Sequence, residues 1–148
     1  MMTKLFNGTF ETLLRVLLIL SVKGRITIDR ILEYEFMATY GREFGISEEN
    51  LHGNNNFNFA EISIRRIYIR KAIGRLYLSG LIELNDNSQG FTYSLSEKGK
   101  KSAAGLKSEY ATEFTVNLKN IIENFDDFDD KGLMRLINES FMIDGRNE

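Results

Sequence analysis

The chain has 148 residues, of which 43% are hydrophobic and 27% charged, so we expect one folded core rather than disorder. It has no cysteine and a single histidine, His52, which excludes disulfides, thiolate metal sites, cysteine nucleophiles and multi-histidine metal centres. The longest apolar run, Val16 to Leu20, is far short of the roughly 20 residues of a membrane span. The start of the chain lacks the pattern of a signal peptide, so we expect a soluble, cytoplasmic protein without a membrane partner.

The formal net charge of −2 conceals an uneven distribution of charge along the chain. Residues 60–107 carry nine Lys and Arg against four Asp and Glu, whereas residues 108–148 carry four against ten. The preceding residues are close to neutral. This asymmetry predicts a basic surface and an acidic surface on the same molecule.

Hydrophobic periodicity predicts the elements of the first half of the chain. A largely apolar helix is expected to be central in the core, and it is followed by a short β-branched segment, a second helix, a polar loop and a third helix. In chain order these elements are predicted at residues 9–23, 25–28, 29–40, 46–58 and 60–79.

The second half begins with the clearest local pattern in the chain. Residues 81–84 and 91–95 read as two strands joined by a turn-forming cluster at residues 85–90, which predicts a β-hairpin. Ser96 can cap a short helix that Gly105 ends. Two further helices are predicted, at residues 110–125 and 133–141.

The predicted fold class is therefore mainly α with a small β-hairpin. The order of elements is that of a winged helix-turn-helix, which we expect in residues 1–107. Residues 108–148 would form an acidic helical extension that packs on this domain or on a partner. Winged helices serve both as DNA readers and as protein-docking modules, so this fold does not decide function.

The third helix has two apolar faces. One face holds Ile62, Ile69, Ile73 and Leu76, and the opposite face holds Ile64, Ile67, Gly74 and Leu78. A helix exposed on one side should be apolar on one face only. We therefore expect this helix to be sandwiched, with its second face covered by the tail helices of this chain or by a partner protein.

The candidate contact residues follow from this helix and from the acidic tail. The predicted DNA- or partner-contacting residues are Arg65, Arg66, Arg70, Lys71 and Arg75. The predicted partner interface consists of Ile64, Ile67, Leu78, Phe125 and Phe128. The alternatives are that the arginines are solvated borders, some paired with the acidic C-terminal half, and that the two phenylalanines form an edge of the core.

Nothing in the sequence indicates catalysis or a cofactor. His52 lies in a polar loop and is predicted to be a surface or loop-anchoring histidine. The acids at residues 126–130 lack the spacing, the central glycine and the terminal glutamate of a calcium loop. The glycines at residues 41 and 45 do not form a phosphate-binding motif. We therefore expect neither an enzyme nor a metal or cofactor site.

Several short segments, in this order and spacing, resemble one family over about the first 115 residues. They are the opening at residues 5–17, the helix at 28–34, Leu51-His52, the run from Ile64-Arg65-Arg66 to Leu81, and Tyr110-Ala111. The family is the middle component of ABC three-component systems, the type found as the small subunit of bacterial Lamassu antiphage systems. The chain departs from the family where Gly8-Thr9 and Gly53 replace positions that often carry proline.

The resemblance implies a non-catalytic adaptor. Its partners would be a coiled-coil ABC ATPase of the SMC-like type, which senses DNA, and an effector subunit, often a nuclease, with DNA engaged through the complex. The alternative is a free-standing winged-helix transcription regulator that dimerises through the apolar stripe of the helix at 110–125. A small enzyme is a third and weaker interpretation.

Overall fold

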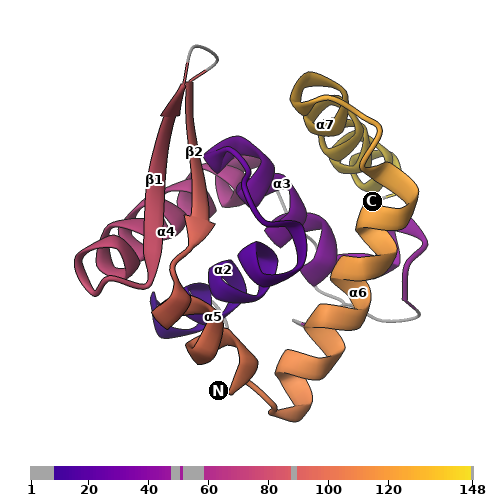
Figure 1. Cartoon of the computed structure of the whole chain (residues 1–148). Helices are drawn as coiled ribbons and strands as arrows, with labels where there is room; N and C mark the ends of the chain where they lie inside the picture. Colours follow the sequence, from indigo (N-terminus) through magenta and orange to yellow (C-terminus); the bar gives the residue numbers. More distant parts are fainter. Residues whose placement is uncertain (1–8, 48–50, 52–58, 88–89, 148) are drawn as a thin grey trace.

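The computed structural model describes residues 9–47, 51, 59–87 and 90–147, so the opening of the chain and His52 lie outside it. Six α-helices and a two-stranded hairpin make up the described part, which confirms the predicted mainly helical fold class (Figure 1). The elements are α2 (Thr9–Lys23), α3 (Ile28–Thr39), the 3-10 turn η1 (Gly41–Phe44), α4 (Phe59–Leu78), β1 (Ile82–Asn87), β2 (Gly90–Leu95), α5 (Glu97–Ala104), α6 (Glu109–Phe125) and α7 (Asp130–Asn147).

Helix α2 is the centre of the core, as its apolar girth predicts. Every side chain from Arg15 to Leu20 is buried, and other helices and the hairpin surround it (Figure 1). The helix is followed directly by Gly24, whose φ of 84° lies in the left-handed region that favours glycine.

The hairpin is longer than predicted. Its strands pair antiparallel in a register that continues to Asn87 opposite Gly90, so residues predicted as turn belong to β1. Asn and Asp have a weak preference for strands, but the cross-strand ladder overrides it. Part of this ladder is a side-chain bond of 3.1 Å from Asn85 Nδ2 to Ser94 Oγ. The short segment before α3 also joins the hairpin, because Ile26 and Tyr93 exchange backbone hydrogen bonds of 3.1 and 2.8 Å.

A tight junction holds the hairpin against α4 and α5. Gly80, two residues after the end of α4, adopts the left-handed conformation, and the N–H of Leu81 donates to the carbonyl of Leu76 at 2.9 Å. Ser96 caps α5 by accepting from the N–H of Gly99 at 3.0 Å. The backbone of Leu81 lies so close to Gly99 that there is no room for a side chain at this position.

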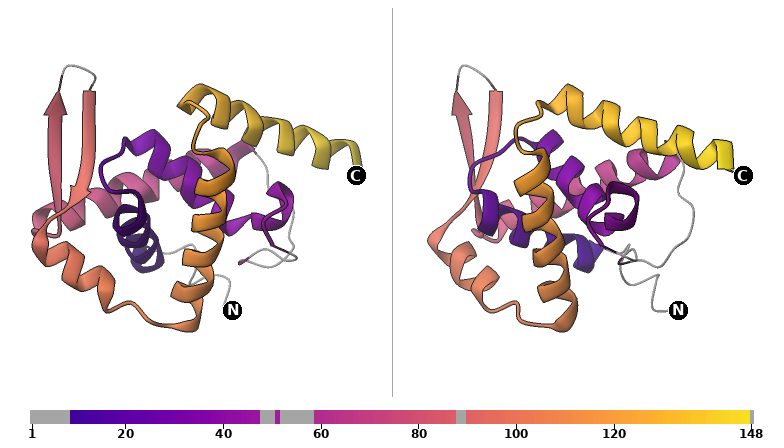
Figure 2. Two further views of the ribbon diagram at one scale, coloured as in Figure 1. Left: turned by 45° about the vertical axis from the view of Figure 1, so that its right-hand side comes forward. Right: turned by 90° about the vertical axis from the view of Figure 1, so that its right-hand side faces the viewer.

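The C-terminal helices cover the side of α2 and α3 that lies away from the hairpin (Figures 1 and 2). Helix α6 packs on α3 and α2, and α7 packs on α3. The predicted apolar stripe of α6 is buried in this contact through Phe114, Leu118 and Ile121. Among the described residues, no helix has the length and apolarity needed to cross a membrane.

Candidate functional site

Helix α4 separates its two apolar faces between the core and the surface. Ile69, Ile73 and Leu76 are buried against the neighbouring elements, which are α2, α3 and β1. On the opposite face, Ile64 is 51% exposed and Leu78 is 86% exposed. The prediction of two faces is therefore confirmed. The suggestion that the tail helices of this chain cover the second face is wrong for the described structure, because Ile64 and Leu78 are exposed and the tail helices pack on α2 and α3 instead.

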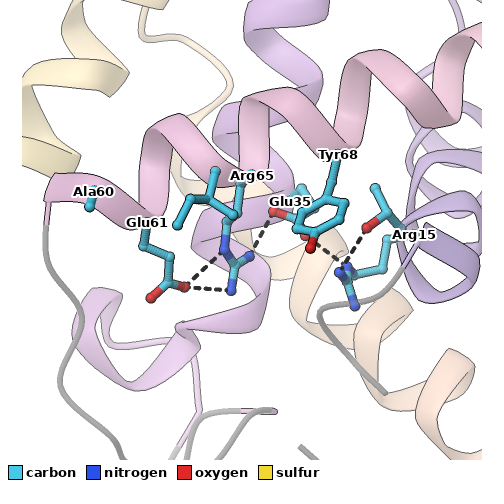
Figure 3. Close-up of a pocket in the computed structure, with 8 residues that line it drawn as sticks. Arg15, Glu35, Ala60, Glu61, Arg65 and Tyr68 are labelled. Carbon is cyan, nitrogen blue, oxygen red and sulfur yellow. Dashed lines mark hydrogen bonds and ion pairs between the residues drawn. The ribbon is translucent and has the colours of Figure 1, made fainter. Parts of the chain in front are cut away.

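Arg65 does not belong to the exposed face, although we expected it to contact a partner or DNA. It lies four residues before Ile69, on the core side of α4, and it is 5% exposed. Its Nη1 donates to Glu35 Oε1 at 2.7 Å and its Nε donates to Glu61 Oε2 at 2.9 Å (Figure 3). The guanidinium also lies 5.2 Å from the ring centroid of Phe36. Arg65 therefore joins α4 to α3 in the interior.

Glu35 is the centre of this charge network because it is shared by two arginines. Arg15 on α2 donates from Nε to Glu35 Oε2 at 2.7 Å (Figure 3). Its Nη1 also donates to the hydroxyl of Tyr110 at 3.2 Å. The side chains of Arg15 and Glu35 are 2% and 1% exposed. Neither Arg15 nor Glu35 is among the contact residues predicted from the sequence. A single arginine inside the otherwise apolar stretch of α2 is the signal that could have found the network.

The buried charges shift the pKa values of their neighbours. Burial alone would lower the pKa of Arg65, but Glu35 and Glu61 outweigh it and raise this pKa above its usual value. Burial raises the pKa of Tyr40, and so does the hydrogen bond from its hydroxyl to Glu61, which measures 2.7 Å to Oε2. Arg65 therefore stays protonated and Tyr40 stays neutral at any physiological pH.

A pocket of about 370 Å³ opens beside this network. Its lining consists of Thr12, Arg15, Glu35, Ala60, Glu61, Ile64, Arg65 and Tyr68 (Figure 3). Both carboxylates in the lining are already bound to arginines, which makes either a poor general base. The described part of the chain contains no group of three or more His, Cys, Asp or Glu residues that could hold a metal ion. The geometry therefore favours a structural role for these charges.

The remaining basic residues of α4 lie on its surface. Arg66 donates from Nη1 to Asp29 Oδ1 at 2.7 Å, in a pair that is partly exposed to solvent. Arg70, Lys71 and Arg75 are exposed, and none of the ion pairs found in the described ranges involves them. The described partners of the α4 arginines thus lie in the N-terminal half and in α4 itself. None of these ion pairs joins an arginine of α4 to the acidic C-terminal half, which was the alternative prediction.

The acidic bend between α6 and α7 is held by basic residues of α2 and α3 instead. Arg30 Nε donates to Asp130 Oδ1 at 2.9 Å, and Lys23 Nζ lies 3.0 Å from Asp126 Oδ2. The hydroxyl of Tyr34 also donates to Asp126, and this bond, with Lys23, lowers the pKa of that carboxyl. These contacts fix the bend against the body of the molecule.

Phe125 and Phe128 lie at this bend and contact each other edge to face, with ring centroids 5.9 Å apart. Phe125 is half-buried and packs against the core, whereas Phe128 is 43% exposed. The two phenylalanines, which were predicted to belong to one partner interface, thus differ in their exposure to solvent. Phe125 occupies the edge of the core, and Phe128 presents part of its ring to solvent.

Together these features define a small, mainly helical protein with a two-stranded hairpin and an exposed helix face that is both apolar and basic. Comparison with models of known protein families shows the family to which the chain is related. The chain matches the model of the ABC-three component (ABC-3C) system Middle Component 2 over residues 5–146, and it belongs to that family. Membership in a three-component system implies an ATPase and a further component as partners. Neither the comparison with curated proteins nor the comparison with solved structures found a match.

Proposed function

We propose that this chain is a non-catalytic adaptor subunit of an antiphage or antiplasmid complex of the Lamassu type. It would link an SMC-like coiled-coil ABC ATPase, which senses DNA, to an effector subunit that is often a nuclease. The observation that carries the proposal is the family match over residues 5–146. The network of paired charges around Glu35, in place of a free acid or base, supports a role without catalysis.

We further propose that residues 1–107 form a winged helix-turn-helix. The order of α2, α3, α4 and the hairpin supports this assignment, and so does the bridge between Ile26 and Tyr93, which adds a third segment beside β2. In this arrangement α4 is the third helix, the element that enters DNA in winged helices that read sequence.

The proposed contact surface is the exposed face of α4. It consists of Ile64, Ile67, Leu78, Arg66, Arg70, Lys71 and Arg75. Arg65 is left out because its guanidinium is already bound to Glu35 and Glu61 in the interior. Phe128 and the acidic tail helices would form a second contact, with another subunit.

Affinity purification tests the assembly directly. The tagged chain is expressed together with the products of the genes that flank its own, and the recovered proteins are identified by mass spectrometry. We expect a large coiled-coil ATPase and a second, effector-like protein. Recovery of a homodimer that binds one discrete DNA sequence at physiological salt would instead establish the transcription regulator.

A double substitution tests the surface. Arg66→Glu with Arg70→Glu removes the pair with Asp29, but exposed pairs contribute only about 0–1 kcal/mol, so the chain should remain folded. We expect loss of complex formation or of DNA engagement with an unchanged circular dichroism spectrum. Unchanged assembly and unchanged defence in cells would refute the assignment of this face.

A further inference from the structure

The exposed face of α4 has the spacing of a coiled-coil seam. Its outward positions are separated alternately by four and three residues, which is the interval of the a and d positions in a heptad repeat. These positions are Ala60, Ile64, Ile67, Lys71, Gly74 and Leu78, and all six are exposed. We call them the α4 seam. At about 1.5 Å per residue it runs for five turns of helix, long enough to receive a second helix along its length.

The composition of the seam suits a helical partner. Ile64, Ile67 and Leu78 are 51%, 54% and 86% exposed, so they offer apolar surface on both halves of the seam. Gly74 lies between the apolar ends, and nothing lies within 4 Å of where its Cβ would be. This position is a hole into which a large side chain of a facing helix can insert. A pocket of about 380 Å³, lined in part by Leu13, Leu78 and Leu81, adjoins the C-terminal end of the seam.

The charges that flank the seam indicate the sign of the charge that a partner should carry. Arg70 and Arg75 occupy the positions beside a and d that pair across a coiled coil, and Lys71 lies within the seam. The single acid of α4, Glu61, is bound to Arg65 and Tyr40 and does not offset them. A partner helix should therefore carry acidic residues opposite these three cations.

We infer that the α4 seam binds an acidic amphipathic α-helix that belongs to another component of the complex. This inference rests on the proposed adaptor function and names the kind of element that the adaptor recognises. The helix would place apolar side chains against Ile64, Ile67 and Leu78. Its Asp or Glu residues would face Arg70, Lys71 and Arg75.

Two other occupants fit the seam less well. A second copy of α4, antiparallel about a two-fold axis at the middle of the seam, would bring Arg70, Lys71 and Arg75 of both copies together in a cluster of like charges. A DNA backbone would satisfy the cations but would leave the apolar side chains at both ends without apolar partners. An acidic helix is the occupant that satisfies both kinds of residue.

The absence of native cysteine allows a site-specific test. Single substitutions Ile67→Cys, Lys71→Cys and Leu78→Cys are labelled with a photoactivatable crosslinker, and each labelled chain is purified in complex with the co-expressed components. Val116→Cys is the matched control, because Val116 is 53% exposed but lies on α6. Crosslinked peptides and any crosslinked nucleic acid are identified by mass spectrometry.

We expect all three seam positions to crosslink to one helical segment of one component. The residues of that segment that become crosslinked should recur every three or four positions and should lie among Asp and Glu residues. The α6 control, Val116→Cys, should not crosslink to this segment. Crosslinks from the seam to DNA or to a second copy of the chain would overturn the inference. So would the absence of seam crosslinks in a complex that forms normally. Failure of the complex to form with wild-type protein would overturn the adaptor function as well, so the two failures are distinguishable.

A charge reversal supplies an independent measurement on the same complex. Lys71→Glu with Arg75→Glu should weaken the complex by at least about tenfold, because two attractive contacts become repulsive. Lys101→Glu with Lys107→Glu makes the same change of net charge at exposed positions outside α4, and it should change affinity less than twofold. Equal effects of the two double variants would show that only net charge matters, and this result would refute the seam.

Discussion

Arg65 and Arg70 lie five residues apart on α4, yet their side chains have opposite surroundings. Arg65 is enclosed by Glu35, Glu61 and the ring of Phe36, whereas Arg70 is exposed to solvent. A buried ion pair adds little net stability when intact, but removal of one partner leaves an uncompensated charge in the interior. The stability lost on substituting either arginine therefore depends on whether the substitution leaves a buried carboxylate without its partner.

We predict that Arg65→Ala lowers the free energy of unfolding by about 3–5 kcal/mol, because Glu61 loses its ion-pair partner and Glu35 keeps only Arg15. Arg70→Ala, on the exposed side of the same helix, should have a small effect. Urea denaturation followed by circular dichroism measures both. Similar losses of stability in the two variants would contradict the burial of Arg65.

Glu33 is a buried acid with a different environment. Its side chain is 1% exposed at the contact between α3 and α7, and its Oε1 has no hydrogen-bond partner among the described residues. Burial and, after it, the negative charge of Asp130 raise its pKa to about 9, and Arg30, 4.0 Å away, offsets them only in part. In the folded state Glu33 is therefore protonated at neutral pH.

The unfolded chain releases this proton near pH 4.5, so the folded state binds one more proton between about pH 4.5 and pH 9. We therefore predict that Glu33 makes stability fall as pH rises through this window, by at most about 1.4 kcal/mol per pH unit. Glu33→Gln should remove this contribution. The stability of the variant relative to wild type should increase from pH 6 to pH 8 in urea titrations. The exposed control Glu113→Gln should follow wild type, and parallel profiles for all three proteins would refute the prediction.

At the scale of elements, α4 and α5 each contain an interior glycine for a different reason. Gly99 lies in the first turn of α5, where the backbone of Leu81 leaves no room for a Cβ. Gly74 lies on the exposed face of α4, where a Cβ would meet nothing within 4 Å. The first glycine permits a close approach of two backbones, whereas the second costs α4 some helix propensity without a packing reason inside this chain.

The same substitution should therefore have opposite effects at the two positions. Gly74→Ala should raise the free energy of unfolding by about 0.5–1 kcal/mol, because alanine favours the helix. Gly99→Ala should lower it by about 1–3 kcal/mol, because the junction of α4, β1 and α5 must separate to admit the methyl group. Thermal denaturation of both variants provides the comparison, and a stabilised Gly99→Ala would contradict the described junction.

At the scale of the whole molecule, the core is one continuous cluster that extends from α2 to α7. The apolar stripe of α6 is part of it, because Phe114, Leu118 and Ile121 are all 0% exposed. The regulator alternative needs this stripe as the interface of a homodimer. In the folded chain the stripe is already used within one molecule, so it is not available to a second copy.

We accordingly predict that the purified chain is a monomer. Light scattering coupled to size-exclusion chromatography should give a mass near 17.1 kDa. The α4 seam should not cause dimerisation, because an antiparallel pair would bring the basic residues Arg70, Lys71 and Arg75 of the two copies together. A stable dimer of twice this mass would contradict this prediction and would favour a regulator that dimerises through another face.

Local patterns were sufficient to predict most of the elements. The apolar girth of α2, the alternation in β2 and the interval of four and three residues along α6 depend only on neighbours in sequence. The end of β1 was predicted too early, because Asn85 to Asn87 read as a turn until β2 is placed opposite them. The division into units at residue 107 stays a prediction.

The candidate site was predicted in part. The two faces of α4 follow from periodicity, and Ile64, Ile67 and Leu78 are exposed as that analysis requires. The spacing of Arg65 before Ile69 could have placed it on the core side. Its partner Glu35 lies 30 residues away in the sequence, and no local pattern relates the two.

The sequence by itself therefore determined the elements, the charge asymmetry and the family resemblance, because each depends on residue type and short spacing. Only the tertiary structure decided which arginine is buried, which acids it binds and which apolar face stays open to solvent. Those outcomes depend on how α2, α3, α4 and α6 pack, and packing joins residues that are far apart in the chain. The long-range ion pairs at Glu35 and the exposed seam of α4 are two consequences of that one arrangement.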